Sequence, residues 1–552
     1  MKREIAQLLK EAVSKAQGAG DLPPLELPPV IVEQPQREEH GDYATNLALQ
    51  VAGRVGMPPR QVAEVIVKYL PEAEFIRRVE VAGPGFINFT LDDGWLAQQV
   101  ETILAQGPSY GRLDMGRGKR VQVEYGSANP TGPLHVGFAR NVVLGDSLAN
   151  LLDRAGYEVE REYYVNDTGT QMRLFYESLY VRYAQALGRE EEIPEGGYQG
   201  RYMEEWGREI AEAEGTRYLG MVREEALKAI GAVGLSKVLE GVKEDLELLG
   251  IRYDNWFSER SLYEDGYFAE VMDILRQGGH IFEEEGAIWF AATALGSDKD
   301  KVVIRSTGEP GYFASDIAYH YEKFIRRGFD WVIDVWGADH QGHVPRMKAM
   351  MRALGLNPER LTLLIYQLVT IKRGGEVLRL SKRTGEFITL REVLDEVGPD
   401  AVRFFLLTHA ADSQMDFDLE LAKEESEENP VYYVQYAHAR VASILRYAEE
   451  IDYSDGDLSL LTHEAELALL RQMVLLPDIV ELAATSLAPH HLTYYAQDLA
   501  SAFHSFYKQC RVVSSYPEDM PLNQARLKLM KACQVVLAQV LGLMGVSAPE
   551  KM

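Results

Sequence analysis

The chain has few cysteines and no long apolar run, and both absences limit what it can be. Only Cys510 and Cys533 occur among 552 residues, which excludes a four-cysteine zinc site and indicates a reducing compartment. No stretch of about 18 uncharged apolar residues is present, so no membrane span is expected. Residues 1–10 are charged and amphipathic, unlike a secretory signal. These features predict a cytoplasmic protein.

Basic residues are scarce relative to acidic ones. The 57 Lys and Arg residues stand against 84 Asp and Glu residues, a formal net charge of −27. Such a surface repels nucleic acid, so any RNA contact must come from local basic patches and from shape. Solubility is the plainer explanation of the acidic excess. The 46% hydrophobic fraction allows large cores, and the length indicates roughly three or four domains.

A strand, a loop and a helix near residue 130 carry the strongest chemical signal. Residues 120–124 alternate like a strand, and residues 141–154 have the pattern of an amphipathic helix. The loop between them is rich in Gly, Pro and Asn and places His135 near the helix start. A helix N-terminus suits a phosphate, and Gly137 lets a planar ligand approach the backbone. An ordinary Pro/Gly turn remains the alternative for the short motif alone.

This loop resembles the first signature of class I aminoacyl-tRNA synthetases, and residues 127–137 are particularly similar to arginyl-tRNA synthetases. The second histidine of that signature is Phe138 here, so His135 or a later residue would have to contact the phosphates. The resemblance implies that Glu124, Ser127 and Asn129 bind arginine. It also implies that His135 and Gly137 contact ATP.

A second strand follows at residues 157–165, which completes the first half of a doubly wound fold. Residues 164–171 again resemble the arginyl family. We expect Asn166, Asp167 and Gln171 to line or buttress the site. A helix start at Asn166 or Asp167 is the structural alternative.

Tyr312 and Asp316 are four residues apart, so on a helix they share one face. A guanidinium favours a carboxylate partner and tolerates an aromatic neighbour. The resemblance implies that both bind arginine; an ordinary acid near a helix N-terminus is the alternative for Asp316.

The polar loop after residues 329–336 resembles the family's loop for arginine and adenosine. The resemblance implies that Gln341 binds the amino acid and that His340 or His343 lies near ATP. The two histidines have no third ligand at a suitable spacing, so we predict no protein-bound metal.

Residues 376–385 resemble the second class I signature, with Arg379 and Lys382 at its two lysine positions. Basic groups on a mobile loop stabilise the charge that develops as pyrophosphate leaves. The resemblance makes His135, Arg379 and Lys382 the catalytic residues and adds Leu380 and Ser381 to the ATP site. A solvated basic loop is the alternative.

Both ends of the chain resemble the tRNA-binding parts of arginyl-tRNA synthetases. Residues 41–46 and 83–89 resemble the N-terminal additional domain, which contacts the tRNA D-loop, and residues 400–403 resemble the motif that names the anticodon-binding domain. Aromatic, amide and basic groups read unstacked bases. The predicted RNA contacts are Tyr43, Asn46, Phe86, Asn88, Tyr436, His438, Arg440, Lys508 and Arg511. Core packing for Phe86, a local contact for Asn46 and core packing for many C-terminal aromatics remain alternatives.

We therefore predict a multidomain α/β protein with a Rossmann-type parallel-sheet catalytic domain. Its expected parts are an N-terminal α+β domain (1–112), a first Rossmann half (113–171), a helical insertion that contacts the acceptor stem (172–299), a second half (300–395) and an α-helical bundle (396–552). The resemblance implies an ATP-dependent, monomeric arginine–tRNA ligase with L-arginine and tRNA(Arg) as partners and Mg²⁺ entering with the nucleotide. Another class I nucleotidyltransferase, or a non-catalytic tRNA-binding relative, is the alternative.

Overall fold

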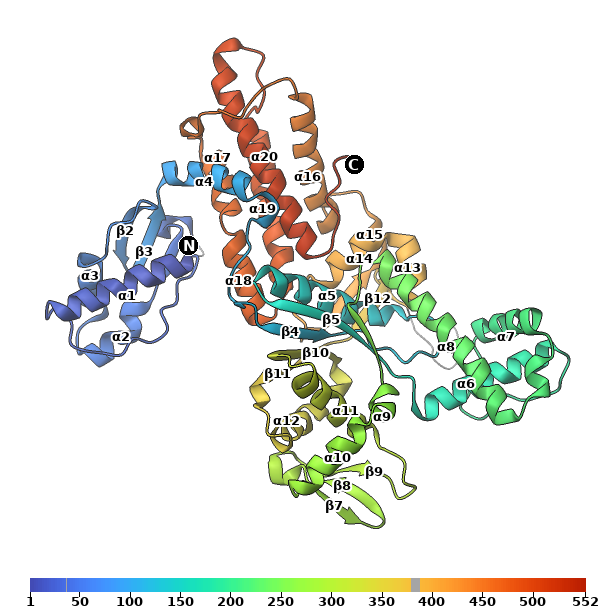
Figure 1. Ribbon diagram of the computed structural model, residues 1–552. Helices are drawn as coiled ribbons and strands as arrows, with labels where there is room; N and C mark the ends of the chain where they lie inside the picture. Colours follow the sequence, from blue (N-terminus) through green and yellow to red (C-terminus); the bar gives the residue numbers. More distant parts are fainter. Residues whose placement is uncertain (36, 379–387) are drawn as a thin grey trace.

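The computed structural model describes residues 1–35, 37–378 and 388–552. Four of the predicted site residues, Arg379, Leu380, Ser381 and Lys382, lie outside the described residues. Figure 1 shows a central sheet with the N-terminal domain on one side, a helical bundle above it and two lobes that extend away from it.

The N-terminal domain packs helices on a small antiparallel sheet. Its strands lie in the order β1 (Tyr43–Thr45), β3 (Phe86–Leu91) and β2 (Ile76–Ala82), and its helices are α1 (Lys2–Gly18), α2 (Leu47–Val55) and α3 (Pro59–Lys68). Helix α1 buries Ile5, Leu9, Ala12 and Ala16, a spacing that forms one apolar stripe, and it packs against α3. Helix α4 (Asp93–Gln106), capped by Asp92, leads out and packs against the C-terminal bundle.

The catalytic core is a five-stranded, fully parallel sheet in the order β11-β10-β4-β5-β6. The strands are β4 (Arg120–Glu124), β5 (Glu158–Val165), β6 (Asn255–Ser258), β10 (Trp331–Gly337) and β11 (Leu361–Tyr366). Helix α5 (Ala139–Arg154) contacts β4, β5 and β10, and α12 (Val344–Ala353) contacts β11. Helices pack against such a sheet because parallel strands bury both faces. The predicted fold class is confirmed.

Two lobes are inserted between the strands of this sheet. The sequence interpretation assigned two strands near them, β6 and β9 (Lys301–Ile304), to the wrong part of the chain. The first lobe consists of α6 (Gly169–Ala186), α7 (Arg201–Glu214) and α8 (Arg223–Leu248). Strand β6 then returns to the parallel sheet, although it falls inside the predicted insertion. The second lobe contains α9 (Ser261–Glu264), α10 (Tyr267–Gln277) and the antiparallel sheet of β7 (Ile281–Glu284), β8 (Ala287–Phe290) and β9 (Lys301–Ile304). The sequence places residues 301–304 in the second Rossmann half; this prediction is wrong, because β9 pairs with β8.

We predict an entirely helical C-terminal part (396–552), but the structure also contains a strand there, β14 (Met415–Asp418). After α13 (Leu390–Val397) and α14 (Pro399–Leu406), β14 (Met415–Asp418) pairs in parallel with β12 (Val369–Arg373), whose other neighbour is β13 (Glu376–Val377); α15 (Leu419–Lys423) follows. The bundle comprises α16 (Pro430–Tyr447), α17 (Glu464–Met473), α18 (Leu476–Ser486), α19 (His490–Gln509) and α20 (Met520–Leu543). Both cysteines are buried, Cys533 on α20 and Cys510 just after α19. Among the described residues, no helix is both long and apolar enough to cross a membrane.

Candidate active site

The signature loop leaves the carboxyl end of β4 in an unusual backbone conformation. Gly126 and Ser127 both have positive φ, at 88° and 64°, and such strain in a non-glycine residue is typical of functional sites. The side chain of Asn141 holds the turn: its Oδ1 accepts the Gly126 N–H at 2.5 Å, and its Nδ2 donates to the Val335 carbonyl at 2.8 Å. Helix α5 thus ties the loop to β10.

His135 caps the helical turn that leads into α5. Its Nδ1 accepts the Gly137 N–H at 2.9 Å, so a neutral ring carries its proton on Nε2, the tautomer that can donate to a phosphate oxygen. The chain after the undescribed segment lies against this turn. The Val136 N–H donates to the Ile388 carbonyl, and the Leu390 N–H donates to the Leu134 carbonyl at 2.8 Å. The residues that flank the second signature therefore reach the first.

Three carboxyl groups stand side by side on neighbouring strands. The strand register pairs Asp334 of β10 with Glu124 of β4, and Glu124 with Glu162 of β5. Like charges in such a row destabilise a sheet unless cations neutralise them. These cations come from α11 (Tyr312–Tyr321) and from the π-helix Glu322–Arg326 and the residue after it.

Lys323 and Arg327 neutralise the row. The Lys323 ammonium donates to Glu124 at 2.5 Å and to Asp334 at 3.0 Å, while Arg327 pairs with Glu162 at 2.6 Å. The Tyr319 hydroxyl also donates to Glu162. All three acids thus have partners from the same helical segment.

Burial and these charges raise the pKa values of two of the acids and lower the pKa of a third. Burial raises the pKa of Glu124 to about 7, although Lys323 opposes the shift. Burial also disfavours the charge of Asp334, but the positive charges of Lys323 and His320 outweigh it and hold the pKa of Asp334 below its usual range. Burial raises the pKa of Asp316 to about 6, against His320 and Arg346. Glu124 and Asp316 are thus two carboxyls whose pKa values are raised by burial, which makes them candidates for binding a cation.

Helix α11 places Tyr312 and Asp316 one turn apart, as the spacing predicts. The Tyr312 side chain is 59% exposed and its hydroxyl lies near Gly169 at the start of α6. His320 links helix α11 to the acid row, because its ring contacts the Asp316 backbone carbonyl at 2.7 Å and the Asp334 carboxyl at 2.9 Å.

Gln341 and His340 are exposed on the turn Ala338–His343 that follows β10. The rings of His340 and His343 lie 5.2 Å apart. No group of three or more His, Cys, Asp or Glu residues suited to a metal ion occurs in the part of the chain that the structure describes.

Polar residues after β5 support the signature loop. Asn166 donates to Asn129 at 3.0 Å, and the Tyr164 N–H donates to Ser127 Oγ at 3.1 Å. Asp167 accepts from Ser258 Oγ at 2.6 Å and from the Arg260 N–H at 3.1 Å, which anchors the end of β6. Gln171, by contrast, is exposed.

The sequence interpretation missed Lys323, Asp334 and His320. The only signal was a set of charged residues within apolar segments, which a surface position explains equally well. Their proximity depends on strand register and on the turn after α11.

Three predicted RNA contacts are buried, which contradicts those predictions. Tyr43 is 1% exposed and its hydroxyl donates to Asp478 at 3.0 Å; Asn88 is 7% exposed. His438 is 3% exposed and its Nδ1 contacts the Pro549 carbonyl at 2.9 Å. Each lacks the exposed face that a base would need.

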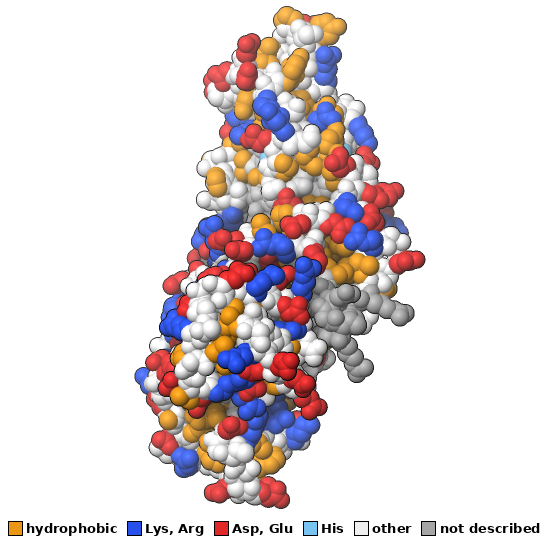
Figure 2. All heavy atoms as spheres, turned by 90° about the vertical axis from the view of Figure 1, so that its right-hand side faces the viewer, with side chains coloured by type: hydrophobic (Ala, Val, Ile, Leu, Met, Phe, Trp, Pro, Cys, Tyr) orange, Lys and Arg blue, Asp and Glu red, His pale blue; other side chains and the backbone are white. Residues whose placement is uncertain are grey.

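The other predicted RNA contacts lie nearer to the surface. Phe86 is 41% exposed, which excludes the core alternative, and Asn46 accepts from Gln50 at 2.8 Å. In the bundle, Arg440 lies over the rings of Tyr436 and Tyr507, while Lys508 and Arg511 are exposed. Figure 2 shows one face of the molecule with basic and acidic side chains interspersed. Such a surface leaves room for local basic contacts despite the net charge.

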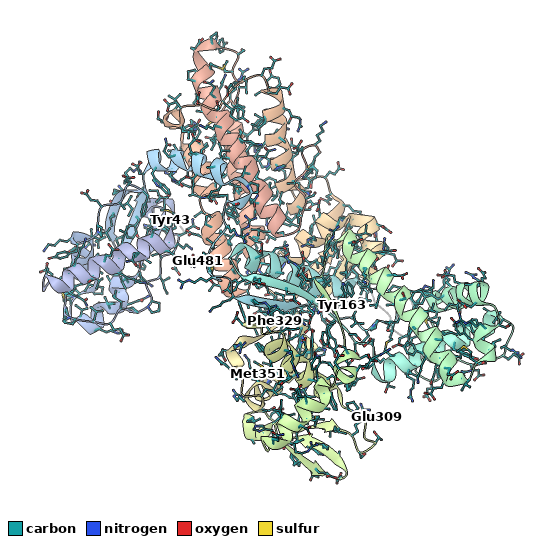
Figure 3. The ribbon with its side chains drawn as sticks, viewed as in Figure 1. Tyr43, Tyr163, Glu309, Phe329, Met351 and Glu481 are labelled. Carbon is teal, nitrogen blue, oxygen red and sulfur yellow. The ribbon has the colours of Figure 1, made fainter. Side chains whose placement is uncertain are left out.

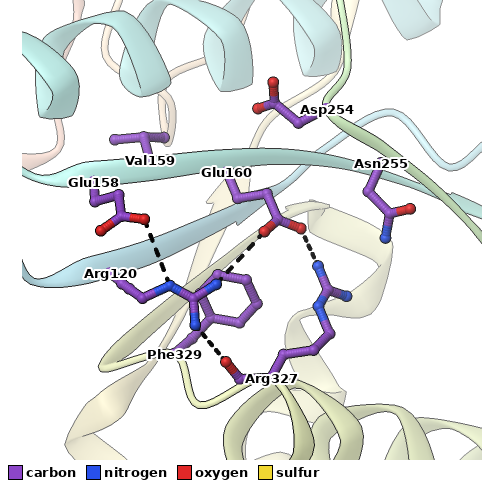
Figure 4. Close-up of a pocket in the computed structure, with 8 residues that line it drawn as sticks. All are labelled: Arg120, Glu158, Val159, Glu160, Asp254, Asn255, Arg327 and Phe329. Atoms are coloured by element: carbon purple, nitrogen blue, oxygen red, sulfur yellow. Dashed lines mark hydrogen bonds and ion pairs between the residues drawn. The ribbon is translucent and has the colours of Figure 1, made fainter.

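A separate depression of about 510 Å³ lies at the opposite, amino-terminal edge of the sheet (Figure 4). Arg120 pairs there with Glu158 and Glu160, and Arg327 pairs with Glu160. Both guanidinium groups lie within 5 Å of the Phe329 ring centre. Because these cations already have partners, we interpret the depression as the outer end of the charge network that supports Glu162.

Comparison with known proteins agrees with this architecture. Three family models match in order: the arginyl tRNA synthetase N terminal domain at residues 3–91, the catalytic domain of class I (R) tRNA synthetases at residues 99–406 and the DALR anticodon binding domain at residues 434–552. The parallel sheet and the matched catalytic domain define a class I aminoacyl-tRNA synthetase.

Full-length relatives narrow the class. The arginine–tRNA ligase of Dehalococcoides mccartyi is 53% identical over 554 residues, which cover 100% of this chain and 99% of that protein. That of Heliobacterium modesticaldum is 48% identical over 561 residues, with the same coverage. The Thermus thermophilus arginyl-tRNA synthetase shares the fold, with a TM-score of 0.79 at 24% identity and 100% coverage of both chains. The chain belongs to the arginyl-tRNA synthetase family.

Proposed function

We infer that this chain is an arginine–tRNA ligase, which activates L-arginine with ATP and joins it to tRNA(Arg). One structural observation supports the choice of amino acid: two carboxyls with pKa values raised by burial, Glu124 at the end of β4 and Asp316 on α11, are both influenced by the charges of Asp334 and His320. Paired carboxylates favour a guanidinium, and burying them without a cationic ligand is costly.

The reaction has two steps. The arginine carboxylate attacks the α-phosphorus of ATP, which forms arginyl-adenylate and releases pyrophosphate. A hydroxyl of the terminal tRNA ribose then attacks the acyl carbon, and AMP leaves. Side chains contribute mainly position and charge stabilisation to such transfers.

We propose that arginine contacts Glu124, Ser127, Asn129, Tyr312, Asp316 and Gln341. Ser127 Oγ lies 3.5 Å from Glu124, so it is placed to orient that carboxylate. The exposed ring of Tyr312 can cover the ligand from the solvent side.

On the nucleotide side, His135 would donate from Nε2 to a phosphate oxygen, and Gly137 would leave room for the nucleotide. His340 or His343 would lie near the adenosine. The resemblance adds Arg379, Leu380, Ser381 and Lys382, and Mg²⁺ would arrive with ATP as part of the substrate.

We further propose that tRNA contacts Phe86 and Asn46 in the N-terminal domain and Tyr436, Arg440, Lys508 and Arg511 in the bundle. The acceptor stem would lie against the first lobe, and the enzyme would act as a monomer in the cytoplasm. We keep 112, 171 and 395 as proposed domain limits. The limit at 299 is replaced by one after β9, which pairs with β8, and β6 belongs to the core sheet although it lies within residues 172–299.

ATP–pyrophosphate exchange with each amino acid, with and without tRNA, tests the function. We expect exchange with arginine and with no other amino acid, and only when tRNA is bound. Exchange with lysine but not arginine would exclude the assignment. No exchange with any amino acid would favour the non-catalytic alternative.

A further inference from the structure

Lys323 is a fully buried cation beside the proposed arginine site. It lies on the π-helix Glu322–Arg326, which continues α11, and its side chain is 0% exposed. A π-turn within a helix is rare and often marks a functional position. Here it points an ammonium group at the acid row rather than at solvent.

The ammonium determines how Glu124 can meet a ligand. It donates to Oε2 of Glu124, whereas Oε1 faces the Ser127 hydroxyl. Its second bond, to Asp334, fixes its own position, and its Nζ lies 4.1 Å from the centre of the Tyr319 ring. Glu124 is therefore held in one orientation with one oxygen on the side of the signature loop.

His320 holds the acid that anchors Lys323. One of its ring nitrogens contacts the Asp316 backbone carbonyl at 2.7 Å, and the other contacts the Asp334 carboxyl at 2.9 Å. Asp334 is therefore held by His320 on one oxygen and by Lys323 on the other.

Lys323 is the cation in direct contact with Glu124. Its attraction is the strongest of the charges that act on Glu124, and it opposes both burial and the repulsion by Asp334. Glu162, the remaining acid of the row, pairs with Arg327.

We propose that Lys323 is a positioning residue of the arginine site, which orients the Glu124 carboxylate and keeps it ionised. This inference rests on the proposed function, because it takes arginine as the ligand of Glu124. Without Lys323, Glu124 loses its buried cationic partner and takes up a proton instead of binding arginine.

The test compares Lys323→Met with the wild-type enzyme in tRNA-dependent ATP–pyrophosphate exchange from pH 6 to pH 9. Loss of the ammonium raises the pKa of Glu124 further, since Lys323 is the main force that lowers it. We expect the KM for arginine at pH 7 to rise at least about tenfold, which corresponds to one pKa unit. The increase shrinks toward pH 9, where Glu124 ionises again, while kcat and the KM for ATP change little.

A double variant, Lys323→Met with Asp334→Asn, guards against misfolding, because it leaves no unpaired charge at Asp334. Asp334 repels the Glu124 charge less than Lys323 attracts it. In the double variant, the rise of the KM for arginine at low pH should therefore occur at a pH between those of the wild type and the single variant. Lys348→Met is the matched control: this partly buried lysine donates to the Pro358 and Leu361 carbonyls, and its loss should leave the profile unshifted.

The outcomes separate the two claims. A wild-type enzyme without arginine-dependent exchange contradicts the proposed function. If the wild type is active and the KM for arginine rises equally at every pH, or does not rise, Lys323 does not act through Glu124 and the inference fails.

Discussion

The guanidinium of Arg403 donates to the carboxylate of Asp146 at 2.5 Å in the interior of the protein. Arg403 lies on α14 and Asp146 on α5, the helix that follows the signature loop. The same guanidinium donates to the Met544 carbonyl at 2.7 Å and to the Leu249 carbonyl at 2.8 Å. One side chain thus joins the catalytic core, the end of the first lobe and the end of the last helix.

Arg403→Met should strongly destabilise the protein, because it leaves Asp146 buried without this partner. Breaking a buried ion pair from one side costs about 3–5 kcal/mol. Chemical denaturation should show this loss in the free energy of unfolding. Arg446→Met is the control: its pair with Glu550 spans 3.8 Å and is exposed, so the change should stay below about 1 kcal/mol. Equal effects would contradict the junction described here.

Arginine binding should weaken in acid. The pKa values of Glu124 and Asp316 are raised to about 7 and about 6, and a cation binds their ionised forms. Protons therefore compete with arginine as pH falls through 7 and then 6, and kcat/KM for arginine should drop up to about tenfold per unit for each group. Exchange assays across pH 5.5–8.5 measure this. A flat profile for arginine would refute the competition.

Asp316→Asn preserves shape but removes one of these charges. A charge-assisted hydrogen bond contributes about 1.5–3 kcal/mol, so the KM for arginine should rise by roughly 10–150-fold while the KM for ATP stays nearly constant. Asp273→Asn is the control, because Asp273 pairs only at the surface with Arg276. An effect on ATP as large as that on arginine would point to a different role.

Tyr43→Phe should affect stability rather than RNA binding. The Tyr43 hydroxyl joins the N-terminal domain to Asp478 of the bundle, and Figure 3 shows Tyr43 near Glu481, at this junction. Loss of a buried hydrogen bond costs about 1–3 kcal/mol, which thermal unfolding should detect. A weaker tRNA complex with unchanged stability would instead restore Tyr43 as an RNA contact.

Phe86→Ala should do the opposite. The exposed ring is available to a base, and stacking on an aromatic side chain contributes about 1–3 kcal/mol. Binding of tRNA(Arg) should weaken roughly 5–150-fold without loss of stability. Ile31→Ala removes another exposed apolar side chain of the same domain, 48% exposed, and should leave binding unchanged. Similar losses in both variants would exclude a specific stacking contact.

Local patterns predicted much of the fold and only part of the site. The alternation at β4 and β5 and the four-residue spacing of Tyr312 and Asp316 indicate structure directly, because strand and helix periods are properties of adjacent residues. Strand partners are not local. The sequence thus predicts β9 as a strand of the core sheet, but β9 belongs to an antiparallel sheet. It predicts the residues of β6 as part of an insertion, but β6 belongs to the core sheet.

The amino-acid sequence by itself determined the family and the local elements with a clear period, such as β4, β5 and α5. The tertiary structure alone decided which charges meet: Lys323 with Glu124 and Asp334, Arg403 with Asp146, and Tyr43 with Asp478. Arg403 and Asp146 are 257 residues apart in the chain, and Tyr43 and Asp478 are 435 residues apart. No local period encodes such contacts; they follow from strand register and helix packing.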